Sequence, residues 1–222
     1  MTDFAGLRSN MVEHQLRTND VTSHDVLDRF GELSRETFVL GPQKPFAYTD
    51  SDILSWRSDL GEERYLMEAA PFARLVQAAL IRPTDLVLDI GCGTGYSAAM
   101  LAGFCESVVA IESASELVEI ATANLIDMQI DNAVVLESPL QHGYAKEGPY
   151  DLIVIDGAVD HVPEKLFEQL RDDGRLLTFI GRGNAGDLAI FRKTSTGTTS
   201  VPVMNASVPP LPGFQLEESF IF

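Results

Sequence analysis

The stretch at residues 86–96, Leu-Val-Leu-Asp-Ile-Gly-Cys-Gly-Thr-Gly-Tyr, constrains the fold of this chain more than any other. The mostly apolar run at 86–90 is typical of a strand buried on both faces of a sheet. Glycines follow at alternate positions, and the small and apolar residues of 97–102 predict a helix after them. Strand, glycine turn and helix in this order begin a nucleotide-binding α/β sheet, whose ligand lies beyond the carboxyl end of the strand. Glycine suits the turn because, without a Cβ, it accepts positive φ and lets a ligand approach the backbone.

The glycine spacing favours one class of ligand. A dinucleotide site usually reads G-x-G-x-x-G, with a helix N-terminus facing the pyrophosphate. Here Gly91, Gly93 and Gly95 alternate, and Asp89 precedes the first glycine by two positions. This pattern, continued by Tyr96, resembles the first motif of S-adenosylmethionine (SAM)-dependent methyltransferases with a Rossmann-like fold. The resemblance implies that these five residues bind SAM. The positively charged amino group and sulfonium of SAM suit a nearby carboxylate, whereas the negative charge of a pyrophosphate does not. The spacing disfavours a nicotinamide oxidoreductase, and a tight turn without a ligand is the alternative.

Composition and charge narrow the class of protein. The chain has 222 residues, 45% of them hydrophobic, and a net charge of −17, so we expect a folded domain that does not attract nucleic acid. It has no apolar run of the roughly 20 residues that span a bilayer, so we expect no membrane partner, and its N-terminus lacks a signal-peptide core. Two cysteines, Cys92 and Cys105, form neither a metal-type pair nor a disulfide framework. We therefore predict a cytoplasmic protein with one domain, 1–222, in which 1–80 form a helical N-terminal extension and 81–222 the SAM-binding α/β core.

Four short segments before the glycine turn resemble the start of a known family. They read Met-Val-Glu-His-Gln-Leu at 11–16, Asp-Val-Leu at 25–27, Arg-Glu-Thr-Phe-Val at 35–39 and Ala-Tyr-Thr-Asp at 47–50. In this order, ahead of a SAM-type loop, they are similar to the protein-L-isoaspartate O-methyltransferases. The resemblance runs from about residue 8 to about residue 211. It implies a SAM-dependent enzyme that methylates a carboxylate of damaged protein.

The next segment departs from that family. The family has Thr-Ile-Ser-x-Pro here, with its serine and threonine against the transferred methyl group and the substrate carboxylate. In this chain residues 61–71 read Gly-Glu-Glu-Arg-Tyr-Leu-Met-Glu-Ala-Ala-Pro, so either Ala69 or Met67 stands at the serine position. Neither side chain donates a hydrogen bond, which indicates an altered acceptor. We expect the segment to begin a helix and Arg64 to form a surface salt bridge, with contact to an acidic substrate as the alternative.

Two further residues are predicted to contact the cofactor. Glu112 ends a second apolar strand and lies 21 residues after Gly91, close to the ~20 expected of a carboxylate that binds ribose hydroxyls. A carboxylate accepts two hydrogen bonds at once, as a cis-diol requires. After the third strand, 133–136, the family has Gly-Asp-Gly, whose aspartate faces the adenine amino group. Ser138 stands at that position here and accepts a hydrogen bond more weakly than a charged group does.

The fourth strand, 151–156, ends in Asp156 at the ligand edge of the sheet. Asp156 is the predicted catalytic residue: it can orient the cofactor, bind a cationic substrate or act as a base. A metal site with Asp160 and His161 is a weaker alternative, and we predict no metal. A fifth strand at 175–181 and a hairpin of 188–192 with 198–203 complete the expected core.

These patterns predict a mostly parallel, doubly wound α/β sheet with a helical N-terminal extension and a late antiparallel hairpin. The function they favour is SAM-dependent methyl transfer to a protein or peptide carboxylate. A catalytically impaired SAM-binding protein and a small-molecule O-methyltransferase are the alternatives.

Overall fold

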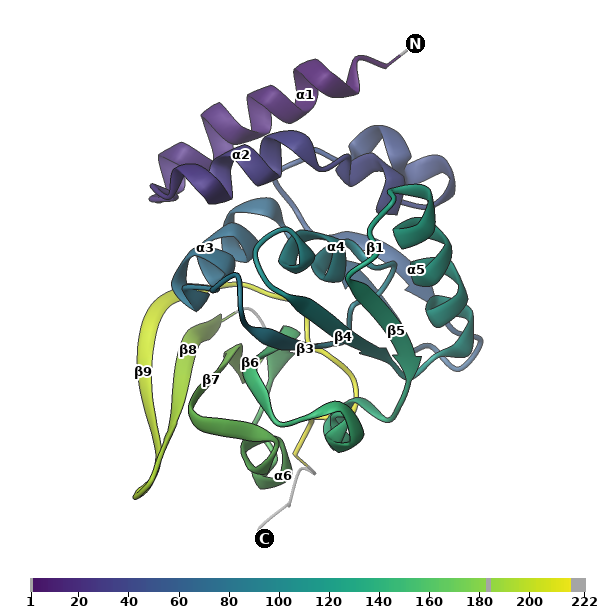
Figure 1. Ribbon diagram of the computed structural model, residues 1–222. Coiled ribbons are helices and arrows are strands. Elements are labelled where there is room, and N and C mark those ends of the chain that lie inside the picture. The colour runs from purple at the N-terminus through teal and green to yellow at the C-terminus, as the bar shows by residue number, and fades with distance from the viewer. Residues whose placement is uncertain (1, 183–184, 217–222) are drawn as a thin grey trace, which may run out of the picture.

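The computed structural model describes residues 2–182 and 185–216 and contains both helices and strands (Figure 1). The α-helices are α1 Phe4–Met11, α2 His24–Glu32, α3 Ala69–Ala79, α4 Tyr96–Ala102, α5 Ser115–Asp127 and α6 Glu164–Glu168. Short 3-10 or π segments are η1 Val12–Leu16, η2 Arg17–Asn19, η3 Arg35–Phe38, η4 Gly41–Phe46, η5 Leu140–His142 and η6 Ala145–Glu147. The strands are β1 Ile53–Arg57, β2 Glu63–Leu66, β3 Leu86–Ile90, β4 Ser107–Glu112, β5 Ala133–Glu137, β6 Tyr150–Val159, β7 Leu170–Arg182, β8 Ala185–Thr194 and β9 Gly197–Ala206.

The central sheet has the order β5-β4-β3-β6-β7-β8-β9. Its strands run parallel from β5 to β7, and β8 and β9 add an antiparallel hairpin at one side. The chain passes outward from β3 to β5 and then returns to β6 on the other side of β3. The carboxyl ends of β3, β4 and β6 therefore meet at the point where the strand order reverses, which is where open α/β sheets bind ligands. The predicted fold class and the late hairpin are confirmed.

Helices cover the sheet on both faces, and β3 is buried between them. Its last four residues are buried, as a strand covered on both faces requires. The N-terminal helices α1 and α2 lie outside α3 and α4, while α6 lies on the opposite side of the sheet (Figure 1). Helix α2 begins after Ser23, whose Oγ accepts a hydrogen bond from the Val26 N–H at 3.4 Å and supplies the N-cap.

A β-hairpin replaces part of the predicted helix. Strands β1 and β2 pair antiparallel and form a separate two-stranded sheet. The turn between them contains Gly61 at φ +85°, and Ser55 Oγ donates to the Arg64 carbonyl at 2.9 Å. The helix begins only at Ala69, so the expectation that it starts near residue 61 is wrong. The alternating burial of residues 63–66 is the period-2 pattern of a strand, too short to stand out from the helix after it.

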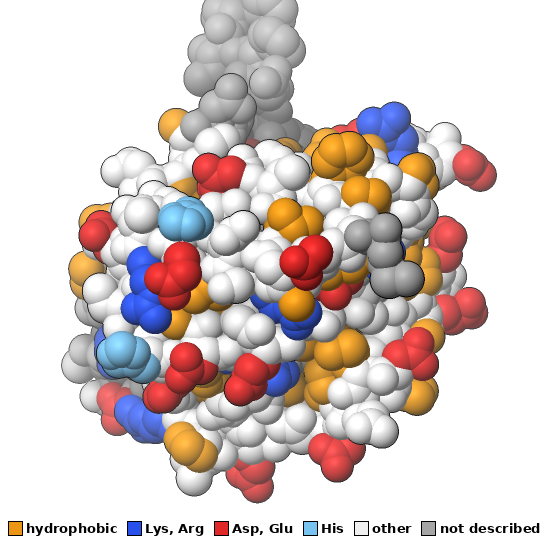
Figure 2. All heavy atoms as spheres, turned by 90° about the horizontal axis from the view of Figure 1, so that it is seen from above, with side chains coloured by type: hydrophobic (Ala, Val, Ile, Leu, Met, Phe, Trp, Pro, Cys, Tyr) orange, Lys and Arg blue, Asp and Glu red, His pale blue; other side chains and the backbone are white. Residues whose placement is uncertain are grey.

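The surface carries many acidic side chains. Seen from above, over the N-terminal helices, acidic groups are spread among fewer basic ones (Figure 2). Within residues 2–182 and 185–216, no helix combines the length and apolar character needed to cross a bilayer.

Candidate active site

Three glycines turn the chain between β3 and α4. Gly91, Gly93 and Gly95 have φ of +84°, +55° and +96°, a region that residues with a Cβ rarely adopt. A Cβ on Gly91 would lie 2.8 Å from Leu211 Cδ1, and one on Gly95 would lie 3.2 Å from Ala121 Cβ. A Cβ on Gly93 would meet nothing within 4 Å. The turn thus requires glycine for its backbone conformation, and Gly93 borders open space.

Glu112 ends β4 beside this turn. Its side chain is fully buried, and its carboxylate accepts hydrogen bonds from two backbone N–H groups. The donors are Gly93, 3.0 Å from Oε1, and Ser113, 2.9 Å from Oε2. The structure therefore brings the predicted ribose-binding carboxylate next to the predicted glycine turn.

Arg64 of β2 binds the same carboxylate. Its Nε lies 3.1 Å from Oε1 and 3.2 Å from Oε2 of Glu112, and its Nη2 donates to Ser113 Oγ at 2.8 Å. Only 2% of the Arg64 side chain is exposed. The prediction that Arg64 forms its salt bridge on the surface is therefore wrong, because the bridge is buried. In a buried ion pair, the attraction between the two charges offsets the cost of removing them from water only when the hydrogen bonds are well formed. Removing one partner leaves an uncompensated buried charge.

Asp89, near the end of β3, and Asp156, at the interruption of the β6–β7 pairing between Val154 and Ala158, add two further carboxyl groups. Burial and the charge of Asp156 raise the pKa of Asp89 well above its usual range, against the hydrogen bond that Ser97 Oγ donates at 2.6 Å. Burial likewise raises the pKa of Asp156 to about 7, while Ser97 and Arg35 act in the opposite direction. In each carboxyl group Oδ1 is buried without a hydrogen-bond partner among the described residues. Free acceptor atoms in carboxyl groups that resist ionisation suit a cationic ligand, whose charge would favour the ionised form.

A proline-rich segment, residues 207–213, runs along the same edge. The Ala158 N–H donates to the Pro209 carbonyl at 2.9 Å, and the Leu211 N–H donates to the Ala158 carbonyl at 2.8 Å. These bonds hold Leu211 over Gly91 and Gly157, where an added Cβ would clash with it. Only about 10 Å³ of free space remains between this segment, β2 and the glycine turn.

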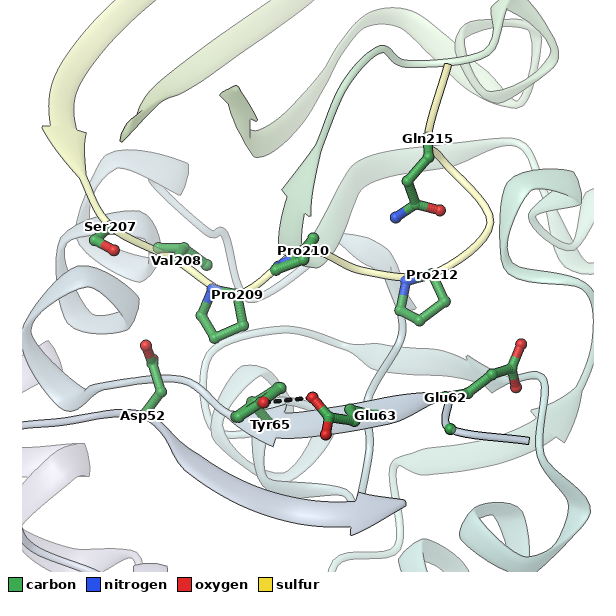
Figure 3. Close-up of a pocket in the computed structure, with 11 residues that line it drawn as sticks. Asp52, Glu62, Glu63, Tyr65, Ser207, Val208, Pro209, Pro210, Pro212 and Gln215 are labelled. Carbon is green, nitrogen blue, oxygen red and sulfur yellow. Dashed lines mark hydrogen bonds between the residues drawn. The ribbon is translucent and has the colours of Figure 1, made fainter. Parts of the chain in front are cut away.

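A larger cavity, the outer cavity, opens beside this narrow space. It has a volume of about 490 Å³, and Figure 3 shows prolines of the 207–213 segment on one wall and residues of β2 on the other. Three acidic side chains line it, Asp52, Glu62 and Glu63, and among the described residues its lining contains neither lysine nor arginine. The Tyr65 hydroxyl on the same wall donates to Glu63 at 2.5 Å (Figure 3). The outer cavity therefore presents negative charge to anything that enters it.

A second cavity, the inner cavity, lies on the β4–β5 side and has a volume of about 400 Å³. Ser113 and Ser138 line it, and it shares Glu62 and Pro212 with the outer cavity. Ser138 Oγ donates to the Gly143 carbonyl at 3.0 Å. Ser113 Oγ is the group that Arg64 holds, so Arg64 lies between the two cavities.

Tyr96 lies in a different environment from the other predicted residues. Its side chain is 2% exposed, and its ring packs against Phe30, Phe38 and Phe72 with centroid separations of 6.4, 5.4 and 5.8 Å. The Arg35 guanidinium stacks over the ring at 4.9 Å. The observed role of Tyr96 is core packing at the start of α4, and its contact with a cofactor stays a prediction.

The residues of this edge fit SAM in their chemistry, provided that two side chains move. Glu112 can accept hydrogen bonds from a ribose diol, and the unpartnered Oδ1 atoms of Asp89 and Asp156 can face a cationic group. In this structure Arg64 takes the acceptor atoms of Glu112 and Leu211 covers Gly91. A cofactor that contacts Glu112 and Gly91 would therefore have to displace both side chains.

Arg64 is the functional candidate whose position the sequence reasoning missed. The signal available was the β-prone run Ile-Leu-Ser-Trp-Arg at 53–57 followed by the Asp-Leu-Gly turn at 59–61, which together are typical of a hairpin. For the metal alternative at Asp156, Asp160 and His161, the part of the chain that the structure describes contains no group of three metal-ligating side chains.

Comparison with known proteins identifies relatives along almost the whole chain. A model of the family described as protein-L-isoaspartate(D-aspartate) O-methyltransferase (PCMT) matches residues 7–208. A protein-L-isoaspartate O-methyltransferase of Koribacter versatilis is 31% identical over 215 residues, covering 97% of this chain and 95% of the relative. One of Methanoculleus marisnigri is 30% identical over 206 residues, covering 93% and 91%.

Two solved structures share the fold. A protein-L-isoaspartate O-methyltransferase superposes with a TM-score of 0.81 at 25% identity, covering 93% of this chain and 66% of that one. A putative family member from Plasmodium falciparum, solved in complex with S-adenosyl-L-homocysteine, gives a TM-score of 0.73 at 18% identity over 95% of this chain and 99% of its own.

Proposed function

Because this chain belongs to the protein-L-isoaspartate(D-aspartate) O-methyltransferase family, we propose that it methylates a carboxylate of a protein or peptide. The chain is a methyltransferase and S-adenosyl-L-methionine is its cofactor. The observation that carries the proposal is the family match over residues 7–208, which includes the glycine turn, Glu112 and Asp156.

The binding roles follow from the chemistry of each group. The backbone of Gly91, Gly93 and Gly95 forms the floor of the site. Glu112 accepts hydrogen bonds from the ribose hydroxyls, and Ser138 contacts the adenine from the inner cavity. Both side chains lie along the same edge of the sheet, and the role of Glu112 requires that Arg64 leave its carboxylate.

Methyl transfer to a carboxylate requires little acid–base catalysis by the protein. When bound, the cofactor supplies an electrophilic methyl group on a cationic sulfur. A carboxylate acceptor is ionised at neutral pH, so the chain need only hold it in line with that methyl group and exclude water. Asp89 and Asp156 then serve to bind and orient positive charge rather than to remove a proton.

The family serine position offers no hydroxyl here. Met67 and Ala69 are both buried, with 3% and 1% of their surfaces exposed. The hydroxyl groups that line the outer cavity belong to Tyr65 and Ser207. We propose that the acceptor enters through the outer cavity and meets these groups.

A second acceptor class has one observation in its favour. The outer cavity carries Asp52, Glu62 and Glu63 on its wall, and negative charge attracts a cationic acceptor better than an anionic one. A neutral or cationic acceptor, in a protein or a small molecule, is therefore the alternative.

Labelled SAM distinguishes these functions. The chain is incubated with an isoaspartyl peptide, the matching aspartyl peptide and a lysine-rich peptide without isoaspartate. Selective labelling of the isoaspartyl peptide supports the proposal. Labelling of the lysine-rich peptide supports the alternative acceptor, and no labelling of any acceptor, including a cell extract, contradicts methyl transfer by this chain.

A further inference from the structure

The Arg64–Glu112 pair places the chain's own cation on the carboxylate that the proposed function assigns to the ribose. Glu112 receives Gly93 N–H and Arg64 Nε on Oε1, and Ser113 N–H and Arg64 Nε on Oε2. The two backbone donors are fixed by the turn after β4. A diol can therefore reach the carboxylate only in place of Arg64.

Arg64 also borders the route to the acceptor. It lines the narrow space of about 10 Å³ together with Glu63, Tyr65 and Pro209. These three residues also line the outer cavity of about 490 Å³. The guanidinium is thus next to the outer cavity while bonded to Glu112, and an arginine side chain has the length and flexibility to move between neighbouring sites.

The outer cavity needs a cation if its occupant is a carboxylate. Asp52, Glu62 and Glu63 give it a negative wall, and Arg57, which pairs with Glu63, lies outside the lining with 60% of its side chain exposed. A released guanidinium would be attracted by these carboxylates and could bind an acceptor carboxylate with two parallel hydrogen bonds.

We propose that Arg64 couples cofactor binding to acceptor recognition: it occupies Glu112 until the cofactor ribose displaces it, and then turns into the outer cavity to bind the acceptor carboxylate. This inference rests on the proposed function. It makes Arg64 a specificity-determining residue and imposes an order in which the cofactor binds before the acceptor.

The chain contains its own reporter of this movement. Trp56, the only tryptophan, pairs with Arg64 across the β1–β2 ladder, and its Nε1 donates to Glu116 Oε2 at 2.8 Å. Displacing Arg64 changes the charge next to this indole. Titration of the wild-type chain with S-adenosylhomocysteine is therefore expected to shift tryptophan emission with the same midpoint as calorimetric binding. Calorimetric binding without any shift contradicts the release.

Substitution of Arg64 tests whether this residue competes with the cofactor for Glu112 or only stabilises the fold. We expect Arg64→Gln to bind S-adenosylhomocysteine roughly tenfold more tightly than wild type, because no buried ion pair opposes the ribose. We also expect its KM for the isoaspartyl peptide to rise roughly tenfold or more while kcat changes less. Arg64→Lys keeps the charge but loses the bidentate geometry. Its affinity for S-adenosylhomocysteine and its KM for the isoaspartyl peptide should both lie between those of wild type and Arg64→Gln.

Two matched controls complete the test. Arg175→Met removes another buried arginine–carboxylate pair, in which Arg175 Nη2 lies 2.7 Å from Asp85 Oδ2. Arg57→Gln removes the surface pair with Glu63 on the same hairpin as Arg64. Neither variant should change the affinity for S-adenosylhomocysteine. Weaker binding by Arg64→Gln, with wild type active, overturns the coupling and leaves the proposed function intact. No binding by either wild type or Arg64→Gln, with no labelled product, overturns the function and the coupling together.

Discussion

Two buried arginine–carboxylate pairs lie at opposite ends of the central sheet. At the amino end, Arg175 of β7 bonds to Asp85, just before β3, at 2.7 Å, and its Nη2 also donates to the Leu80 carbonyl at 2.9 Å. At the carboxyl end, Arg64 bonds to Glu112. The amino-end pair connects α3, β3 and β7 and lines none of the cavities described above. In the carboxyl-end pair, Arg64 lines the narrow space beside the outer cavity and bonds to Ser113, which lines the inner cavity.

The difference shows how the same interaction can serve structure or function. Both pairs are almost wholly buried, with side-chain exposures of 7% and 2% for Arg175 and Asp85, and 2% and 0% for Arg64 and Glu112. Asp85 has no proposed ligand and bonds to groups of its own chain whether or not the cofactor is bound. Glu112 is the carboxylate that a ribose would bind, so its arginine has a competitor.

The largest expected effect comes from removing the carboxylate at each end. Glu112→Ala leaves Arg64 buried without its partner, and we expect the free energy of unfolding to fall by about 3–5 kcal/mol. S-adenosylhomocysteine binding should be lost as well. Asp85→Ala should lower stability by a similar amount and retain binding in whatever fraction is folded. Denaturant unfolding and calorimetry measure the two effects, and equal loss of binding in both variants would refute the distinction.

The next largest effect is expected at the glycine turn. Gly91→Ala places a Cβ 2.8 Å from Leu211 at φ +84°, so we expect a loss of about 1–3 kcal/mol in unfolding free energy and weaker S-adenosylhomocysteine binding. Gly197→Ala, at φ +134° with nothing within 4 Å, tests backbone strain alone. The control should bind the ligand as tightly as wild type does. Wild-type affinity in Gly91→Ala would show that the turn is not the floor of the site.

A smaller effect, dependent on pH, is expected from Asp156. Because its pKa is raised to about 7 in the folded chain, from about 3.9 when unfolded, the folded state holds the proton more tightly. The stability gained from this proton is complete below about pH 4 and is lost as pH rises through about 7. Asp156→Asn removes this dependence, so its thermal midpoint relative to wild type should rise from pH 4.5 to pH 8. Asp59→Asn, on the exposed hairpin turn, is the control, and a constant difference for Asp156→Asn would contradict the raised pKa.

The smallest effect is expected at the surface pair of the hairpin. Arg57 and Glu63 form a salt bridge with side-chain exposures of 60% and 30%. Exposed pairs contribute little, so Arg57→Gln should change the unfolding free energy by less than about 1 kcal/mol. A loss comparable to that of Glu112→Ala would contradict the view that the exposed pair contributes little and the buried Arg64–Glu112 pair contributes more.

The carboxyl end of the sheet also shows what a sequence does and does not reveal. The turn at 91–95 and the position of Glu112 follow from local patterns, because a buried strand, alternating glycines and a spacing near 20 residues are all read from neighbouring positions. The predicted end of the fourth strand at Asp156 is wrong, because β6 continues to Val159; Asp156 lies where the pairing of β6 with β7 is interrupted, between Val154 and Ala158. The contribution of each of these residues to SAM binding or catalysis remains a prediction.

The β1–β2 hairpin was not predicted, for physical reasons. Its strands are short, and the pairing register shifts between Leu54 and Trp56, so period-2 alternation is interrupted. The partner that buries Arg64 is Glu112, 48 residues later. No local propensity indicates such a pairing, and an arginine beside two glutamates in sequence usually remains on the surface.

The most direct test of the account is a crystal structure of the wild-type chain with bound S-adenosylhomocysteine. We predict that the ribose hydroxyls bond to the Glu112 carboxylate and that the Arg64 guanidinium lies in the outer cavity, near Glu63. A structure in which the ligand is bound while Arg64 still holds Glu112 would contradict it.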